Sequence, residues 1–392
     1  MDLSPVPAPV TEGSRHAPMR ALRALLTLPV EASGVSQTCV AMLRAAARAG
    51  RPVSLHAPIV RWDGLRGVNV TVALPRVFRG LPYRLLRTYA DSPLQARFTG
   101  ALAEGEVAYL WPDTPLETYE RVAKRGNPIV IEAVNTRMAV AKEVLDAAYA
   151  ALGSPPLHGI TAERIALQTE RTAMCSAVFA PSALVEASYA GTPAAERLIP
   201  AGYGTWVPQT LPERPPVDGR PVRFLFVGRD GVRKGLHHLL EVWRNVPEGA
   251  ELRIVGEIPP LLQELYGDVL NQPSVSAAGF TEVMAAEYAV ADVAILPSLE
   301  EGDPIATYEA ASHGLPVIAT VAGAGRFGAE TGLVDMVGTG DVAAIRDAVA
   351  RYTADAELRR YQGARLRAAS FAYDWSLAGP TRFAKLDAFL AR

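Results

Sequence analysis

The chain has 392 residues, which is long enough for two domains that each bury a core of their own. Apolar residues make up 49% of it and charged residues 20%, a globular composition that excludes a disordered or fibrous chain. The formal net charge of -2 argues against strong electrostatic attraction to nucleic acid, and no apolar run reaches the length of a membrane span.

The first residues differ from the rest of the chain. Four prolines and no continuous apolar core fall within the first twenty residues, so we predict a flexible leader over 1–18 and no signal peptide. The chain has two cysteines, Cys39 and Cys175, in segments that read as helix or the approach to a strand. Buried thiols in a reducing, cytoplasmic setting are therefore expected.

Residues 19–207 show short β-rich runs alternating with longer helical ones, which predicts an N-terminal parallel α/β domain. The expected strands are 21–28, 52–56, 68–74, 107–111, 128–134 and 177–180. Apolar residues from Val35 to Ala47 follow one face of a helix that Gly50 can close.

The turn before that helix contains Ser33 and Gly34. Ser33 could cap the helix, which is the simpler explanation. Gly34 would also let the backbone approach a phosphate from one side of a cleft between domains.

The segment Arg76–Arg97 mixes five arginines with apolar and aromatic residues. Such a segment can lie on an anionic membrane surface, which would make the protein peripheral at the inner face of the membrane. The alternative, which we favour, is a helix with a core stripe and arginines that extend to solvent around it.

A run of prolines and glycines over 208–219 predicts a linker. A second α/β domain follows over 220–370, with strands expected at 221–228, 251–256, 274–278, 292–297 and 316–320. In the last segment, 371–392, a helix from Pro380 to Arg392 could pack back across the first domain.

The first strand of the second domain runs into a loop with three glycines and three cations. The glycines Gly228, Gly231 and Gly235 let backbone amides approach an anion, and Arg or Lys side chains neutralise it. The cations are Arg229, Arg233 and Lys234. The spacing matches neither a dinucleotide fingerprint nor a Walker motif, so an ordinary turn with solvated cations stays an alternative.

A second motif is Leu296–Ala310, a strand end, a polar loop and a helix start that carry Glu301 and Glu309. Carboxylates are good acceptors for the hydroxyls of a vicinal diol, so one can hold a ribose and the other a hexose. Gly302 can bring its amide to the same ligand. The alternative is that Glu301 caps the helix and Glu309 is a surface residue.

The histidines show no metal-ligand spacing, and no Ser/His/Asp signature is present. We therefore expect no metal, no cofactor and no hydrolytic triad.

With these motifs the chain resembles the retaining glycosyltransferases of family four, which have the GT-B fold, two Rossmann-like domains facing each other across a cleft. The similarity covers most of the chain and is strongest from Phe224 to Thr320. Its motifs are Val-Gly-Arg followed by Lys-Gly (227–235), Arg-Ile-Val-Gly-Glu (253–257), Gly-Phe-Thr (279–281), Ala-Asp-Val-Ala-Ile-Leu-Pro-Ser (291–298) and the Glu301/Glu309 pair.

The resemblance implies retaining, metal-independent transfer of a sugar from a nucleotide sugar, a UDP- or GDP-sugar above all, to a saccharide, glycolipid or glycan precursor. Arg229, Lys234 and Glu301 would be the catalytic residues, with the two cations on the diphosphate and Glu301 on the sugar. The remaining donor-binding residues would be Glu309 on the ribose, Gly256, Glu257, Phe280 and Thr281 around the base, and Gly34, Gly228, Gly302 and Asp303.

Two departures from the family pattern leave the substrates open. The loop reads Glu-Gly-Asp-Pro where many members read Glu-Gly-Phe-Gly, so Asp303 would lie near the sugar and Pro304 removes one amide. The first-domain histidine that many members carry is missing from the matching strand end, where Glu132, Asn135 or Arg137 would serve the acceptor.

Two other functions stay open: a nucleotide-sugar epimerase of related fold, and a paralogue that binds the nucleotide sugar without transferring it. An epimerase needs acid and base groups around the sugar, and the sequence shows no such cluster beyond the motif. The intact quartet Arg229, Lys234, Glu301 and Glu309 argues against an inactive paralogue.

Overall fold

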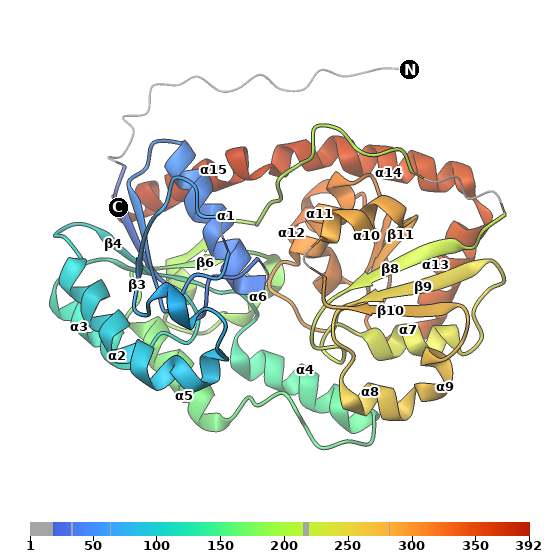
Figure 1. The fold of residues 1–392 in the computed structure, drawn as a ribbon, viewed down its shortest axis with the longest axis horizontal. Helices are drawn as coiled ribbons and strands as arrows, with labels where there is room; N and C mark the ends of the chain where they lie inside the picture. The colour runs from blue at the N-terminus through green and yellow to red at the C-terminus, as the bar shows by residue number, and fades with distance from the viewer. Residues whose placement is uncertain (1–18, 33, 63, 215–218, 282) are drawn as a thin grey trace.

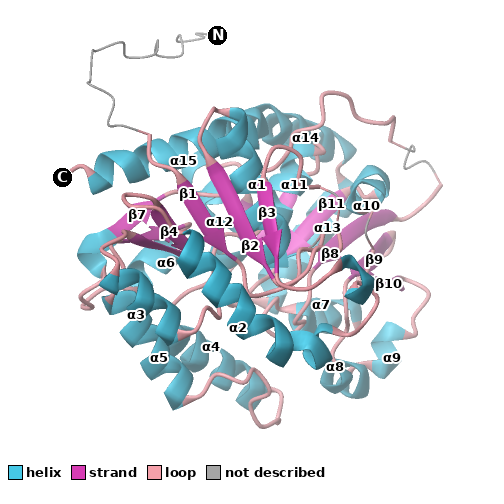
Figure 2. Ribbon diagram, turned by 60° about the vertical axis from the view of Figure 1, so that its left-hand side comes forward, coloured by secondary structure: helices cyan, strands magenta, loops and turns pink. Residues whose placement is uncertain are grey.

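The computed structural model describes residues 19–392 except 33, 63, 215–218 and 282. The predicted leader, Ser33 and four residues of the predicted linker lie outside the described part. Within it the chain forms two α/β domains, each built on one parallel sheet with helices on both faces (Figures 1 and 2).

The N-terminal sheet has seven strands in the order β3-β2-β1-β4-β5-β6-β7. They are β1 (Leu22–Leu25), β2 (Val53–Ala57), β3 (Asn69–Val72), β4 (Val107–Leu110), β5 (Ile129–Glu132), β6 (Ala177–Ala180) and β7 (Leu198–Pro200). All neighbours are parallel, and Leu22 pairs with both Val53 and Val107. The six predicted strands are confirmed, whereas β7 was not predicted as a strand.

The C-terminal sheet repeats this topology with six parallel strands in the order β10-β9-β8-β11-β12-β13. They are β8 (Val222–Val227), β9 (Ala250–Val255), β10 (Val275–Gly279), β11 (Val293–Leu296), β12 (Val317–Ala319) and β13 (Asp335–Met336). The strand order reverses between β1 and β4 and again between β8 and β11. Open α/β sheets bind ligands at the carboxyl ends of the strands at such points.

Helices cover the sheets. In the N-terminal domain they are α1 (Gly34–Arg48), η1 (Arg76–Phe78), α2 (Tyr83–Ala101), α3 (Leu116–Lys124), α4 (Met138–Ala151), α5 (Ala162–Ala173), α6 (Ala183–Ser188) and η2 (Ala195–Arg197). In the C-terminal domain they are α7 (Leu236–Trp243), α8 (Pro260–Leu265), α9 (Gly267–Leu270), α10 (Met284–Val290), α11 (Ile305–Ser312), α12 (Val321–Thr331), α13 (Val342–Ala354) and α14 (Ala356–Ser370). The chain ends with η3 (Phe371–Tyr373) and α15 (Trp375–Leu390).

The central strands β4, β5, β6 and β11 are buried at every position, as parallel strands covered on both faces must be. This burial explains why their sequences are continuous apolar runs. Cys39 and Cys175 are buried and unpaired, which confirms the expected thiols.

Helix α15 lies over the N-terminal domain, while α14 lies over the C-terminal domain (Figure 1). The strongest contact of α15 is with α1, where Gly379 packs against Ala45. Arg51, which follows α1, forms a buried ion pair with Asp387 of α15. The predicted start near Pro380 is wrong. The helix begins at Trp375 because the Asp374 carboxylate caps it by accepting a hydrogen bond from the Ser376 amide.

The segment Arg76–Arg97 forms η1 and most of α2. It buries a stripe of Leu86, Ala90 and Leu94, as a core helix would. It also exposes Leu85 (62%) and Tyr89 (74%) on another face. Among the described residues, no helix is both long and apolar enough to cross a membrane.

Candidate functional site

A cavity of 400 Å³ lies between the two domains, at the carboxyl ends of β8 and β11 and opposite the loops after β1 and β5. It brings together ten of the twelve residues predicted to bind a donor: Gly34, Gly228, Arg229, Lys234, Gly256, Phe280, Thr281, Glu301, Asp303 and Glu309. The other two, Glu257 and Gly302, are not among the residues that line it. Glu257 is exposed, and Gly302 is buried beside the cavity.

Glycine is required where backbones meet around this cavity. A Cβ added at Gly256, whose φ is +131°, would lie 1.9 Å from the Gly228 carbonyl oxygen. At Gly302 it would lie 1.9 Å from the carbonyl oxygen of Val134 in the other domain. Gly302 therefore contributes the close contact between the domains.

Glu301 lies at the centre of a charged cluster. Its carboxylate contacts the Lys234 ammonium directly, lies 3.1 Å from Arg233 Nη1, and accepts a 3.2 Å hydrogen bond from Ser298. Burial alone would raise the pKa of Glu301, but Lys234 and Arg233 outweigh it and hold the pKa below its ordinary value. Glu301 is thus ionised at neutral pH although only 5% of it is exposed.

Glu309 has a different environment. Its carboxylate accepts a 2.8 Å hydrogen bond from the Tyr288 hydroxyl, and the Tyr288 ring stacks on His313 with centroids 4.9 Å apart. Burial raises the pKa of Glu309 to about 7, against the lowering effect of the Tyr288 hydrogen bond. Glu309 therefore changes charge near neutral pH.

At the mouth of the cavity the Arg229 guanidinium lies 4.9 Å from the centroid of the Phe280 ring. Phe280 is 56% exposed, so its face is available to an aromatic base as well as to the cation.

Asp303 lines the cavity, but other groups occupy both its oxygens. Oδ2 accepts bonds from the Tyr203 amide (2.8 Å) and the Tyr308 hydroxyl (2.7 Å), and Oδ1 accepts one from the Arg326 amide (2.8 Å). Burial raises the pKa of Asp303 to about 6, against these hydrogen bonds. The carboxylate predicted to lie near the sugar lines the cavity and also ties three segments of the chain together.

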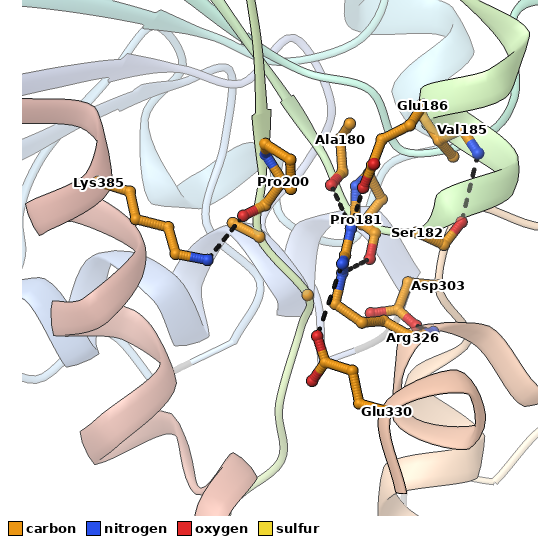
Figure 3. Close-up of polar contacts among 12 residues, drawn as sticks. Ala180, Pro181, Ser182, Val185, Glu186, Pro200, Asp303, Arg326, Glu330 and Lys385 are labelled. Carbon is orange, nitrogen blue, oxygen red and sulfur yellow. Dashed lines mark hydrogen bonds and ion pairs between the residues drawn. The ribbon is translucent and has the colours of Figure 1, made fainter. Parts of the chain in front are cut away.

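The Arg326 side chain continues this tie into the N-terminal domain (Figure 3). Its Nε donates to the Pro181 carbonyl oxygen at 2.8 Å, and its Nη2 contacts the Glu186 carboxylate. The turn that directs Arg326 requires Gly325, whose φ is +58° and where an added Cβ would lie 2.2 Å from Asp303 Oδ1.

Glu300 and Arg233 belong to the site but were missing from the predicted site residues. Glu300 is 3% exposed, and its Oε1 accepts bonds from the Thr136 amide (2.9 Å) and hydroxyl (2.8 Å) across the domain interface. Burial raises the pKa of Glu300, and Arg233 opposes that rise. In the sequence, only its position next to Glu301 pointed to Glu300 as a site residue. Arg233 could be recognised as one of the three cations in the loop after β8.

Of the three residues predicted for the acceptor, Glu132 and Asn135 both line a second cavity, in the N-terminal domain, whereas Arg137 lines neither cavity. Asn135 also lines the interdomain cavity. Glu132 is 4% exposed, and its carboxylate binds Arg382 of α15 and the hydroxyls of Tyr109 and Tyr203. Arg137 faces Thr169 and the Tyr189 ring, outside that cavity. Through Arg382, Glu132 holds α15 on the sheet, and its role toward an acceptor stays a prediction.

Across the described part of the chain, no group of three or more His, Cys, Asp or Glu side chains is placed to hold a metal ion.

Comparisons with known proteins agree with this arrangement. Residues 221–355, most of the C-terminal domain, match the family described as glycosyl transferases group 1. No curated protein matches the sequence. The predicted resemblance to glycosyltransferases is confirmed at this level, whereas family four in particular stays a prediction.

Solved structures with the same fold cover almost the whole chain. A sucrose-phosphate synthase from Thermosynechococcus elongatus has a TM-score of 0.73 at 19% identity, with 92% of this chain and 97% of that one covered. WaaG, a glycosyltransferase involved in lipopolysaccharide biosynthesis, has a TM-score of 0.69 at 15% identity (92% and 98% covered). Anabaena HepE in complex with UDP and glucose has a TM-score of 0.66 at 15% identity (92% and 98% covered). The predicted GT-B fold is confirmed.

Proposed function

From a GT-B fold whose C-terminal domain matches the glycosyl transferases group 1, we propose that the chain is a retaining glycosyltransferase that uses a nucleotide-sugar donor. The observation that carries this proposal is that one cavity between the domains gathers Arg229, Lys234, Glu301 and Glu309. Cations for a diphosphate and carboxylates for two sets of hydroxyls are the groups that a nucleotide sugar requires.

Within this proposal each residue has a separate role. Arg229 and Lys234 bind the diphosphate, Glu309 the ribose hydroxyls and Glu301 the transferred sugar. The exposed face of Phe280, beside Gly256 and Thr281, receives the base. Gly34 brings the backbone of the N-terminal domain toward the same ligand.

The reaction breaks the bond between the anomeric carbon and the diphosphate oxygen and forms one to an acceptor oxygen on the same face. The acceptor proton passes to the leaving phosphate oxygen, so the step needs no other base. The main catalytic contribution is stabilisation of the charge that develops on the diphosphate by Arg229 and Lys234. Since the Lys234 ammonium already contacts Glu301, it must bind the carboxylate and the phosphate at the same time.

Two neighbours support the substrate classes. The HepE structures hold UDP with glucose and UDP-glucose, which supports a UDP-sugar donor here, with a GDP-sugar as the alternative. WaaG acts in lipopolysaccharide biosynthesis, which supports a saccharide, glycolipid or glycan precursor as acceptor. We also propose that the transfer requires no divalent metal.

The test is a panel of UDP-, GDP- and ADP-sugars, with and without acceptor saccharides and with and without EDTA, in which binding, nucleotide release and products are recorded. Transfer with retained anomeric configuration in EDTA supports the proposal. Binding without turnover would indicate an inactive paralogue, an isomerised sugar would indicate an epimerase, and no binding at all would refute the donor site.

We further propose peripheral contact with the inner face of the membrane through η1 and α2. Val77 (81% exposed) of η1 and Leu85 and Tyr89 of α2 are exposed apolar side chains, and Arg84 and Arg87 of α2 are exposed as well. Apolar side chains flanked by arginines suit an anionic lipid surface. The unpaired Cys39 and Cys175 favour the reducing cytoplasmic side.

A further inference from the structure

A separate cavity, of 210 Å³, lies in the C-terminal domain at the end of α11, between α10, α14 and the linker that joins the two domains. No described residue lines both this cavity and the interdomain cavity. Three basic residues line it, Arg214, His313 and Arg367, and the other lining residues are apolar or glycine. Of the described residues that line it, none carries a carboxylate.

Glycines bring α14 against the end of α11. A Cβ added at Gly363 of α14 would lie 2.2 Å from the carbonyl oxygen of Gly314, which has a φ of +70°. This close approach places Arg367, one turn further along α14, between α11 and the linker. Its Nη1 contacts the Ser312 carbonyl oxygen, and its Nη2 donates to the Pro208 carbonyl oxygen at 2.7 Å. The Arg367 guanidinium is therefore held in a fixed position at the cavity.

The positive charges at this cavity are not balanced by ion pairs. Arg214 Nη2 donates to the His313 carbonyl oxygen at 2.9 Å, but no described carboxylate forms an ion pair with Arg214, His313 or Arg367. Asp292 acts on Arg214 from a distance, but its oxygens already bind another arginine at 2.7 and 3.0 Å. Glu213 is exposed and does not line the cavity. The carboxyl end of a helix carries about half a negative charge, which two guanidinium groups outweigh.

Each of the three basic side chains also keeps a nitrogen for a ligand. Arg214 Nη1, Arg367 Nε and His313 Nε2 have no hydrogen-bond partner among the described residues, and none of these atoms is cut off from solvent. The other ring nitrogen of His313, Nδ1, lies 2.8 Å from the Glu309 carbonyl oxygen and so carries the proton of the neutral ring. Guanidinium groups without a carboxylate partner are the groups that bind phosphate oxygens.

We infer that this cavity binds a small phosphate-type dianion, held by Arg214, Arg367 and His313. The two guanidinium groups supply permanent positive charge. His313 donates from Nε2 once that nitrogen is protonated, so binding takes up a proton where the free ring is neutral. The site is separate from the proposed donor site and does not depend on transferase activity.

His313 makes the affinity dependent on pH. Burial lowers the pKa of His313, and the charges of Arg367 and Arg214 lower it further, against the hydrogen bond to the Glu309 carbonyl. The remaining group against the ring is Tyr288 of α10, which stacks on it. A bound dianion favours the charged ring and raises this pKa, so the affinity should increase as the pH falls.

A dianion bound here would connect three parts of the chain, because Arg214 belongs to the linker, His313 follows α11 and Arg367 belongs to α14. It would add to the contacts that Arg214 and Arg367 already make with backbone carbonyls. Since the folded cavity binds the anion and the unfolded chain does not, the melting temperature should rise with anion concentration.

The test measures binding of sulfate, inorganic phosphate and glucose 6-phosphate to the full chain by isothermal titration calorimetry, with chloride at equal ionic strength as the reference. The variants Arg214→Gln and Arg367→Gln lose the charge but keep an N–H donor for the backbone carbonyls. His313→Phe loses both nitrogens but keeps a ring beside Tyr288.

Two controls show where the anion binds. Arg365→Gln removes another arginine of α14, which lies 5.3 Å from the centroid of the Tyr361 ring and does not line the cavity. Lys234→Ala removes a cation from the interdomain cavity, where phosphate could bind instead. Circular dichroism and the melting temperature without anion show whether each variant folds.

We expect one anion to bind per chain, with its Kd raised about tenfold in Arg214→Gln and in Arg367→Gln and unchanged in both controls. Sulfate, whose own charge is constant near neutral pH, should bind more tightly at lower pH, and His313→Phe should lose this dependence. Glucose 6-phosphate bound as tightly as phosphate would identify a phosphomonoester site, and its exclusion would identify a site for the inorganic anion.

Three results would overturn the inference. Weaker binding in Lys234→Ala with no change in the two arginine variants would place the anion in the interdomain cavity. An equal Kd in Arg365→Gln and Arg214→Gln would show that only the overall charge matters. No binding of sulfate or phosphate beyond the chloride reference would show that the cavity holds no such anion. None of these results bears on transfer from a nucleotide sugar.

Discussion

Lys234 and Glu301 form an ion pair inside the interdomain cavity, although 67 positions separate them in the chain. The lysine comes from the loop after β8 and the glutamate from the loop after β11, the two strands between which the sheet order reverses. The pair keeps Glu301 charged despite its burial. A diphosphate that binds Lys234 therefore contacts the same ammonium group that pairs with Glu301, the residue proposed to hold the sugar.

Replacing Lys234 tests the charge stabilisation. In Lys234→Ala we expect kcat/KM for transfer from the donor to fall about 100-fold or more, since one group that stabilises developing charge is typically worth that much. Steady-state kinetics measure it. Lys142→Ala, which removes a lysine paired with Asp146 on the surface of α4, should leave kcat/KM unchanged. Equal effects of the two substitutions would contradict the assignment.

Glu309 predicts a pH dependence of donor binding. Its pKa is raised to about 7, and only the carboxylate accepts bonds from both ribose hydroxyls, so affinity for UDP-glucose should increase as the pH rises through about 7. Tyr288→Phe removes the hydrogen bond that favours the carboxylate, so the midpoint should move to higher pH. Calorimetric titrations at several pH values measure both effects. The same dependence in Glu309→Gln would show that another group is responsible.

Asp303 predicts a loss of stability on substitution. Asp303→Asn replaces one of the oxygens that accept from the Tyr203 and Arg326 amides by an NH₂ group, so we expect the free energy of unfolding at pH 7 to fall by about 1–3 kcal/mol. Urea unfolding measures it. Asp341→Asn, an exposed N-cap residue of α13, should change stability by less than about 0.5 kcal/mol because Asn caps helices as well as Asp.

The pH dependence of stability at Asp303 has a defined sign. The pKa is raised from 3.8 to about 6, so the folded protein keeps a proton that the unfolded chain has lost in this range. The stabilising contribution is complete below pH 3.8 and is lost as the pH rises through about 6. In Asp303→Asn this part of the pH dependence should disappear. If urea unfolding of the variant follows the same pH profile as the original protein, another group causes it.

Gly325 lies within α12 and Gly332 is its C-cap, and both have a positive φ. Gly332 has a φ of +63° and open space around it, so Gly332→Ala should cost only the strain of the left-handed backbone, about 1–2 kcal/mol. Gly325→Ala adds a clash with Asp303 Oδ1 and a backbone conformation, with ψ at −155°, that essentially only glycine adopts, so it should cost clearly more. Thermal unfolding of the two variants measures the difference. Equal melting temperatures would contradict the close packing of Gly325 on Asp303.

The proposed membrane surface predicts binding to anionic vesicles. The double variant Leu85→Ser/Tyr89→Ser should no longer sediment with phosphatidylglycerol vesicles, because it removes exposed apolar area from α2. The control Leu377→Ser/Tyr361→Ser removes an exposed leucine and tyrosine from α15 and α14 and should sediment normally. High salt should weaken the binding. Equal sedimentation of both double variants would refute this surface.

Local patterns were sufficient for the elements and for the donor motifs. Apolar runs of four to eight residues gave the buried strands, because a parallel sheet covered on both faces needs them. The short strands β7 and β13 left no such run, since they have three and two residues. Helix α15 starts at Trp375 because Asp374 caps it. The apolar periodicity behind the prediction begins only at Pro380, so it gave no sign of this earlier start.

The sequence by itself determined that the chain forms two parallel α/β domains. It also determined that the loops carrying four residues lie close together: Glu301, Glu309, Arg229 and Lys234. Carboxyl ends of parallel strands meet at one edge of a sheet, so chain order alone places their loops together. Only the tertiary structure decided what the buried carboxylates bind. Glu300 reaches Thr136 and Glu132 reaches Arg382 across 164 and 250 positions. Such contacts depend on how the two domains and the last helix are oriented, and orientation leaves no periodic signal in the chain.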